Sequence, residues 1–157
     1  MKLRNSFKIS LGLTSLAVLG LVMSEPVNAQ NQEPISDSQP TAVIDNSGST
    51  NFFGYHINVS PSGDATYVNG TEQGTGQIST SLAAKFFSDI SSAMPLSQLA
   101  FQPCFKSASF GTTTYVEFQH QTSPDISCPS KDSRVQALYD DAAEIAQALN
   151  VQLRPRR

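Results

Sequence analysis

The sequence predicts an α+β fold: one small domain with an antiparallel sheet of about four strands and two amphipathic helices packed on one face of that sheet. Two stretches carry apolar residues at helical spacing, and four shorter stretches read as strands, by alternation or by the turn residues that bound them. Their order along the chain is strand, strand, helix, strand, strand, helix. Two hairpins that each precede a helix favour a single sheet with both helices on the same side.

The first predicted hairpin lies within residues 52–68. In FFGYHINVS, alternation puts four apolar side chains on one face of a strand: Phe53, Tyr55, Ile57 and Val59. The turn at Pro61–Asp64 leads into a second strand at residues 65–68, which ends at Asn69-Gly70. The polar, glycine-rich residues 71–77 are predicted to connect this hairpin to the first helix.

The first predicted helix covers residues 79–94. Ser79, Thr80 or Ser81 can cap its start, and Pro95 ends it. One stripe of the helix is apolar and consists of Leu82, Ala83, Phe86, Phe87, Ile90, Ala93 and Met94. The stripe predicts that this helix packs on the sheet, with the two phenylalanines in the core rather than in a ligand site.

The second predicted hairpin pairs Phe101–Ser109 with Thr112–Gln119, around Phe110-Gly111. A last helix follows a cap at Asp132 or Ser133 and runs to about Asn150, with an apolar stripe of Val135, Leu138, Tyr139, Ala142, Ile145, Ala146 and Leu149. Packing of both helices on the sheet is expected to bury six side chains: Leu82, Phe86, Ile90, Leu138, Ala142 and Ile145.

Residues 1–29 have the pattern of a secretory signal peptide. Three basic residues precede an uncharged, mostly apolar run at residues 9–23, and small residues precede a predicted cleavage after Ala29. The apolar run is shorter than the roughly 18–20 residues of a membrane-spanning helix, so no membrane span is expected after cleavage. We therefore expect a secreted or periplasmic protein.

Three regions follow the signal peptide. Residues 30–50 are rich in Gln, Ser, Asn, Asp and Pro and are predicted to be a flexible polar leader, with a short added strand around Thr41–Ile44 as the alternative. Residues 51–153 are the predicted α+β domain. Residues 154–157 form a basic C-terminal tail that is predicted to be frayed.

The chain has two cysteines, Cys104 and Cys128, and export predicts that they form a disulfide. A zinc site would need four ligands, and the chain contains only two histidines to complete one. A redox-active pair would usually have the spacing C-x-x-C.

Charge excludes one class of partner. The chain has 10 Lys and Arg against 13 Asp and Glu, and removal of residues 1–29 leaves 7 against 12. An acidic domain repels phosphate backbones, so we expect no nucleic-acid partner.

The sequence contains no signature of an active site, such as G-x-S-x-G, H-E-x-x-H or a phosphate-binding loop, and we assign no catalytic residue, cofactor or metal ligand. The one site hypothesis joins His120 to Asp125, with Glu117 nearby, as an acid/base pair or partial metal site. The alternative is a solvated loop histidine. His56 is predicted to lie at the sheet surface or edge, and the last helix is predicted to expose an acidic cluster of Asp140, Asp141 and Glu144.

These observations favour an exported, non-enzymatic binding module for an extracytoplasmic protein or small ligand, acting through the sheet face, an edge strand or the loop ends. The alternative is a small exported hydrolase centred on His120 and Asp125. No motif is specific enough to indicate a family.

Overall fold

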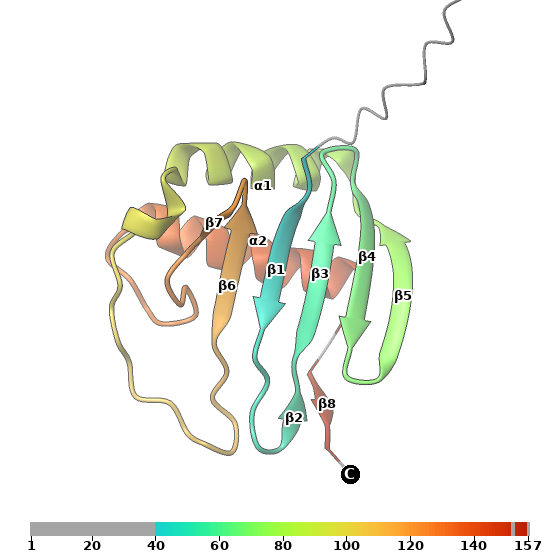
Figure 1. Cartoon of the computed structure of the whole chain (residues 1–157), viewed down its shortest axis with the longest axis vertical. Coiled ribbons are helices and arrows are strands. Elements are labelled where there is room, and N and C mark those ends of the chain that lie inside the picture. The colour runs from blue at the N-terminus through green and yellow to red at the C-terminus, as the bar shows by residue number, and fades with distance from the viewer. Residues whose placement is uncertain (1–39, 152, 157) are drawn as a thin grey trace, which may run out of the picture. The chain divides into compact units, whose positions relative to one another are not determined.

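The computed structural model of the protein describes residues 40–151 and 153–156 (Figure 1). The strands are β1 (Ala42–Asn46), β2 (Phe52–Phe53), β3 (Tyr55–Val59), β4 (Asp64–Asn69), β5 (Glu72–Gln77), β6 (Thr114–Phe118), β7 (Gln121–Thr122) and β8 (Arg154–Pro155). The helices are α1 (Thr80–Ala93) and α2 (Ser133–Ala148), and a short 3₁₀ helix, η1 (Leu96–Gln98), follows α1. The predicted signal peptide and residues 30–39 of the predicted leader lie outside the described residues.

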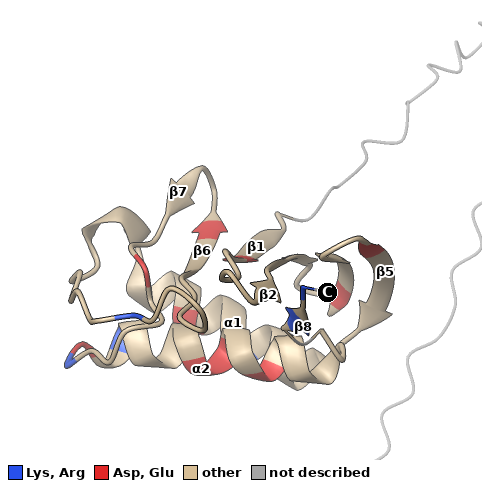
Figure 2. Cartoon of the chain, turned by 90° about the horizontal axis from the view of Figure 1, so that it is seen from below, with Lys and Arg blue, Asp and Glu red and all other residues tan. Residues whose placement is uncertain are grey.

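Six strands form one antiparallel sheet in the order β5-β4-β3-β1-β6-β7. Both helices lie on the same face of this sheet (Figures 1 and 2). The predicted α+β class, with its antiparallel sheet, two helices and one disulfide, is confirmed. The predicted number of about four strands is wrong, since the sheet has six.

The most consequential difference is β1, which lies in the middle of the sheet between β3 and β6. Ala42 and Ile44 are fully buried against the helices, whereas Val43 and Asp45 point to the other face. The prediction of a flexible leader up to Thr50 is therefore wrong for residues 42–46, and the alternative of a strand around Thr41–Ile44 is confirmed. The error arose because only two side chains of this strand are buried and apolar, so polar neighbours dominate its composition.

Two further predictions fail for related reasons. Residues 72–77, predicted to be a connection, form edge strand β5. Their polar, glycine-rich composition does not indicate that they pair with β4. Phe101–Ser109, predicted to be a strand, is a loop, and both Phe101 and Phe105 are exposed. The partner of β6 in the sheet is therefore β1, which lies far away in sequence.

The helices match their prediction closely. The Ser79 side chain caps α1 by accepting a hydrogen bond from the Leu82 backbone N–H, and Asp132 caps α2 in the same way for Arg134. All six side chains predicted to be buried are buried: Leu82, Phe86, Ile90, Leu138, Ala142 and Ile145. Phe87 is half-buried and packs edge-on against Phe86, so both phenylalanines contribute to the core.

Residues 154–156 of the C-terminal tail are not frayed as predicted, and Arg157 lies outside the described residues. Arg154 and Pro155 form β8, which pairs with β2, and the Arg154 guanidinium forms an ion pair with Glu72. The Arg156 guanidinium lies 4.8 Å from the centre of the Phe53 ring. These contacts attach the basic tail to the domain because charge and aromatic partners are available on β2 and β5.

Cys104 and Cys128 form the predicted disulfide, with Cα atoms 5.6 Å apart. It joins the loop that precedes β6 to the loop that precedes α2. No helix within residues 40–151 is long and apolar enough to cross a membrane.

Candidate functional site

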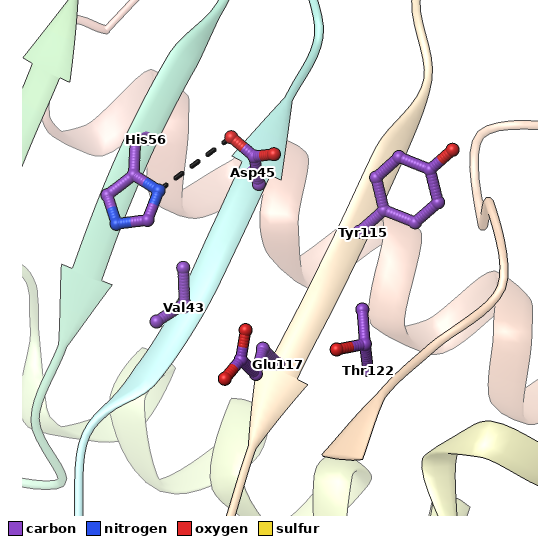
Figure 3. Close-up of a pocket in the computed structure, with 6 residues that line it drawn as sticks. All are labelled: Val43, Asp45, His56, Tyr115, Glu117 and Thr122. Atoms are coloured by element: carbon purple, nitrogen blue, oxygen red, sulfur yellow. Dashed lines mark ion pairs between the residues drawn. The ribbon is translucent and has the colours of Figure 1, made fainter. Parts of the chain in front are cut away.

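The candidate site is the open face, by which we mean the face of the six-stranded sheet that is turned away from α1 and α2. Strand alternation sends every second side chain to this face. Two rows of cross-strand partners follow from the register: His56, Asp45 and Tyr115 in one, and Asn58, Val43, Glu117 and Thr122 in the next. Figure 3 shows most of these side chains on the same side of the strands.

In the first row, Asp45 of β1 lies between His56 of β3 and Tyr115 of β6. The imidazole Nδ1 of His56 lies 3.7 Å from the Asp45 carboxylate, an ion pair when the histidine is protonated. The side chains of these two residues are 46% and 56% exposed, so the pair is hydrated rather than enclosed. This geometry confirms the predicted surface position of His56.

The second row supplies Val43, Glu117 and Thr122, and together the two rows enclose a shallow hollow of about 310 Å³. Its lining combines two carboxylates, one imidazole, one phenol, one hydroxyl and one aliphatic side chain: Asp45, Glu117, His56, Tyr115, Thr122 and Val43 (Figure 3). The hollow therefore offers both apolar contact and negative charge to a ligand.

The strands of the six-stranded sheet contain acidic residues but no lysine or arginine. In Figure 2 the basic residues lie on the helices, the loops and β8. Among the described residues, no basic side chain forms an ion pair with Glu117, and only His56 does so with Asp45. The hollow therefore carries negative charge that no arginine or lysine of the described chain neutralises.

The structure does not join His120 to Asp125. His120 is exposed in the turn between β6 and β7, with a backbone φ of 62°, and no hydrogen bond or ion pair links it to Asp125 in the part of the chain that the structure describes. Glu117, the third member of that hypothesis, belongs to the open face.

Asp125 instead holds a loop together. Its carboxylate accepts hydrogen bonds from the Lys106 ammonium, from the Ser127 hydroxyl and N–H, and from the Thr114 N–H. Burial acts to raise the pKa of Asp125, but these donors outweigh it and hold the pKa below its ordinary value. The carboxylate thus ties the disulfide-bearing loops to the start of β6.

The acidic cluster of α2 is only partly the solvated face that was predicted. Asp140 and Glu144 are exposed, but the Asp141 side chain is 1% exposed and forms an ion pair with Lys85 of α1. Burial raises the pKa of Asp141, and Lys85 lowers it less than burial raises it. The prediction is therefore wrong for Asp141, because α1 covers it and supplies its partner.

Sequence reasoning missed Val43 and Asp45, because both lie in the segment predicted to be a leader. The signal that could have found them is the short apolar run at residues 42–44 beside Asp45; the structure buries Ala42 and Ile44 and turns Val43 and Asp45 to the open face. Within the described residues, no group of three or more His, Cys, Asp or Glu side chains is placed to hold a metal ion.

The fold and the site together define a small α+β domain with one disulfide and an exposed, acidic sheet face. No protein-family model, curated protein or solved structure matches the chain.

Proposed function

We propose that this protein is an exported, non-enzymatic binding module that binds a ligand bearing a cationic group on its open face. One observation carries the proposal: Asp45 and Glu117 border the same hollow, and no Lys or Arg side chain of the described residues lines it. A ligand with an ammonium or guanidinium group would supply the missing positive charge.

The apolar part of the hollow suits the rest of such a ligand. The stem of a lysine or arginine side chain is aliphatic and packs against apolar surface while its charged head stays hydrated. Val43 and the Tyr115 ring are half-buried and offer that surface between the two carboxylates. Each carboxylate is exposed, so each ion pair is expected to contribute about 0.2–1 kcal/mol and to weaken as salt is added.

The rival function is a small exported hydrolase centred on His120 and Asp125. Nucleophilic catalysis needs a base within hydrogen-bond reach of its nucleophile and a third group that orients the base. Asp125 is occupied by Lys106, Ser127 and a backbone N–H, and it makes no contact with His120 among the described residues. These contacts favour the binding module.

Export is supported by two features. The disulfide between Cys104 and Cys128 is typical of proteins that fold outside the cytosol. The pattern of residues 1–29, described above, agrees with it.

Calorimetric titration of the chain from Gln30 onward with tri-lysine tests the proposal, with tri-glutamate as the matched anionic peptide. We expect binding of tri-lysine alone, weakened by added salt. Glu117→Gln and Asp45→Asn each keep the shape of the side chain and should weaken binding roughly twofold to fivefold.

Glu144→Gln, on the exposed face of α2, is the control and should leave the affinity unchanged. The proposal fails if tri-lysine does not bind, or if it binds the variant lacking both site carboxylates as well as it binds the natural chain. A screen for ester, peptide and glycan hydrolysis with the His120→Ala variant as control tests the rival.

A further inference from the structure

Within residues 40–151 and 153–156, no strand pairs with the outer side of β5, which is a sheet edge. β5 is the first strand in the sheet order and pairs only with β4, in unbroken register from Asn69 opposite Glu72 to Asp64 opposite Gln77. Natural sheets usually protect such an edge with lysine, proline, a bulge or a very short strand. The opposite edge follows this rule, since β7 has only two residues, but β5 has six and contains neither lysine nor proline.

The backbone groups that point outward from β5 can be identified. The Ile78 N–H donates a hydrogen bond to the Gly63 carbonyl at 2.9 Å, so Ile78 points toward the β4 side. Backbone direction alternates along a strand at the edge of an antiparallel pair, so the N–H and C=O groups of Gln73, Thr75 and Gln77 point outward. In the described part of the chain, these outward groups have no hydrogen-bond partner.

The sequence of this edge is symmetric. Residues 73–77 read Gln-Gly-Thr-Gly-Gln, which is the same in both directions. If two copies pair antiparallel about Thr75, then Gln73 faces Gln77, Gly74 faces Gly76, and Thr75 faces its own counterpart. All three outward-pointing residues of one copy then meet outward-pointing residues of the other, and each opposed pair can exchange two hydrogen bonds.

Neither charge nor side-chain bulk opposes this pairing. Glu72 would face Ile78 rather than a second Glu72, and its carboxylate is already paired with Arg154. On the helix side the strand presents Gly74 and Gly76, because Cβ atoms there would lie 2.4 Å from the Tyr67 ring and 2.7 Å from Leu149. Residues 73–77 of the edge are therefore neutral and present no bulky side chain on the helix side.

We propose that β5 is a self-association edge that pairs antiparallel with β5 of a second copy of this chain, about a two-fold axis at Thr75. The two sheets become one continuous sheet, and the two open faces lie side by side on it. The contact is isologous, as closed two-fold dimers require. It does not depend on what the open face binds.

The contact is one short strand pair, which places the dimer in the weak, concentration-dependent class. Sedimentation equilibrium of the chain from Gln30 onward, over a concentration series up to about 1 mM, should therefore show a monomer–dimer equilibrium. A monomer at every concentration overturns the proposal.

A mixture of isotope-labelled and unlabelled protein identifies the register. Gly74 and Gly76 of the two copies form a pair without mutual hydrogen bonds, whose Cα atoms approach to about 4.5 Å. An intermolecular nuclear Overhauser effect between the Hα atoms of Gly74 and Gly76 is expected. A dimer without this contact uses another surface and overturns the proposal.

Substitutions at Thr75 test the edge directly. Thr75→Pro removes an outward N–H that β4 does not use, so it should preserve the monomer fold and raise the dimer dissociation constant roughly tenfold or more. Thr75→Lys and Thr75→Glu should each dissociate the dimer by like-charge repulsion across the axis, and an equimolar mixture of the two should form a heterodimer.

Thr66→Lys is the matched control, because Thr66 is the neighbour of Thr75 on the same face of β4 but does not lie at the edge. It should leave the dimer intact. If Thr75→Pro does not fold, the lysine and glutamate variants decide alone. A dimer that persists in both of them would exclude pairing through β5.

Discussion

At the scale of single residues, the contact between Lys85 and Asp141 joins the two helices by an asymmetric ion pair. The Asp141 side chain is 1% exposed, whereas that of Lys85 is 53% exposed. One oxygen of the carboxylate has no hydrogen-bond partner among the described residues. Removing the lysine therefore leaves the buried Asp141 carboxylate without a cationic partner. Removing the carboxylate instead leaves an ammonium group that water can reach.

We expect Lys85→Gln to lower the free energy of unfolding by about 3 kcal/mol at neutral pH. Asp141→Asn, which removes the buried charge, should cost at most about 1 kcal/mol. Urea unfolding of both variants, with the exposed Asp140→Asn as control, measures the difference. Equal costs for the two changes would show that the buried charge does not dominate.

The decrease in the free energy of unfolding caused by Lys85→Gln should also depend on pH. Burial raises the pKa of Asp141 in the folded protein above its unfolded value, so the folded state binds the proton more tightly. Stability from this group is therefore present at low pH and is lost as pH rises through the folded pKa. Without Lys85 that pKa rises further, so the variant should lose less stability near pH 4 than near pH 7.

At the scale of elements, β1 shows how one strand divides the protein into a core side and a site side. Ile44 and Val43 are neighbours in sequence, yet Ile44 is fully buried under the helices and Val43 lines the open face. The strand also occupies the middle of the sheet, where both of its edges are paired.

Ile44→Ala should lower the free energy of unfolding by about 2–5 kcal/mol, because it leaves a cavity beneath α1 and α2. Val43→Ala removes a similar amount of side chain from the open face and should cost less than about 1 kcal/mol. A chain that begins at Asn51, as the predicted domain does, should not fold because it lacks the central strand. Circular dichroism of these variants checks each outcome, and a folded chain from Asn51 would contradict the role of β1.

The disulfide is a second element-scale feature. It closes a segment with a sequence separation of 24 residues, which contains loops and short strands but no α-helix. In the chain-entropy model a loop of this length stabilises the fold by roughly 3.5 kcal/mol.

Changing Cys104 and Cys128 together to Ser should therefore lower stability by roughly 2–4 kcal/mol and leave tri-lysine binding intact wherever the variant folds. Thermal unfolding and titration of the same sample test both statements. Unchanged stability with lost binding would indicate a functional rather than a structural disulfide.

Elements were predictable where one local pattern determined them. Both helices have a polar cap and a single apolar stripe, so the sequence placed their starts at Ser79–Ser81 and Asp132–Ser133, and the structure selects Ser79 and Asp132. Strand β5 has no apolar residue, and its position depends on β4, which no local pattern encodes. Phe101 and Phe105 misled the prediction because alternating apolar residues indicate a strand only when one face is buried, and both rings are exposed.

At the scale of the whole molecule, one face of the sheet forms the core that stabilises the fold, and the other face forms the candidate binding site. Its helix-covered face contains the apolar core, whereas its open face displays polar and acidic side chains from four different strands. His56, Tyr115 and Glu117 could be placed on strands from sequence, but their juxtaposition with Asp45 could not. It depends on the pairing of β1 with both β3 and β6, which are separated by more than 50 residues of chain.

The most direct test of the open face as a binding surface is a map of backbone amide chemical shifts during titration with tri-lysine. We expect the largest changes at Asp45, His56, Tyr115 and Glu117, and we expect them to disappear when both carboxylates are changed to amides. Changes concentrated on the helices, on the loop around Phe105 or on β5, or no changes at all, would contradict the assignment of ligand binding to the open face.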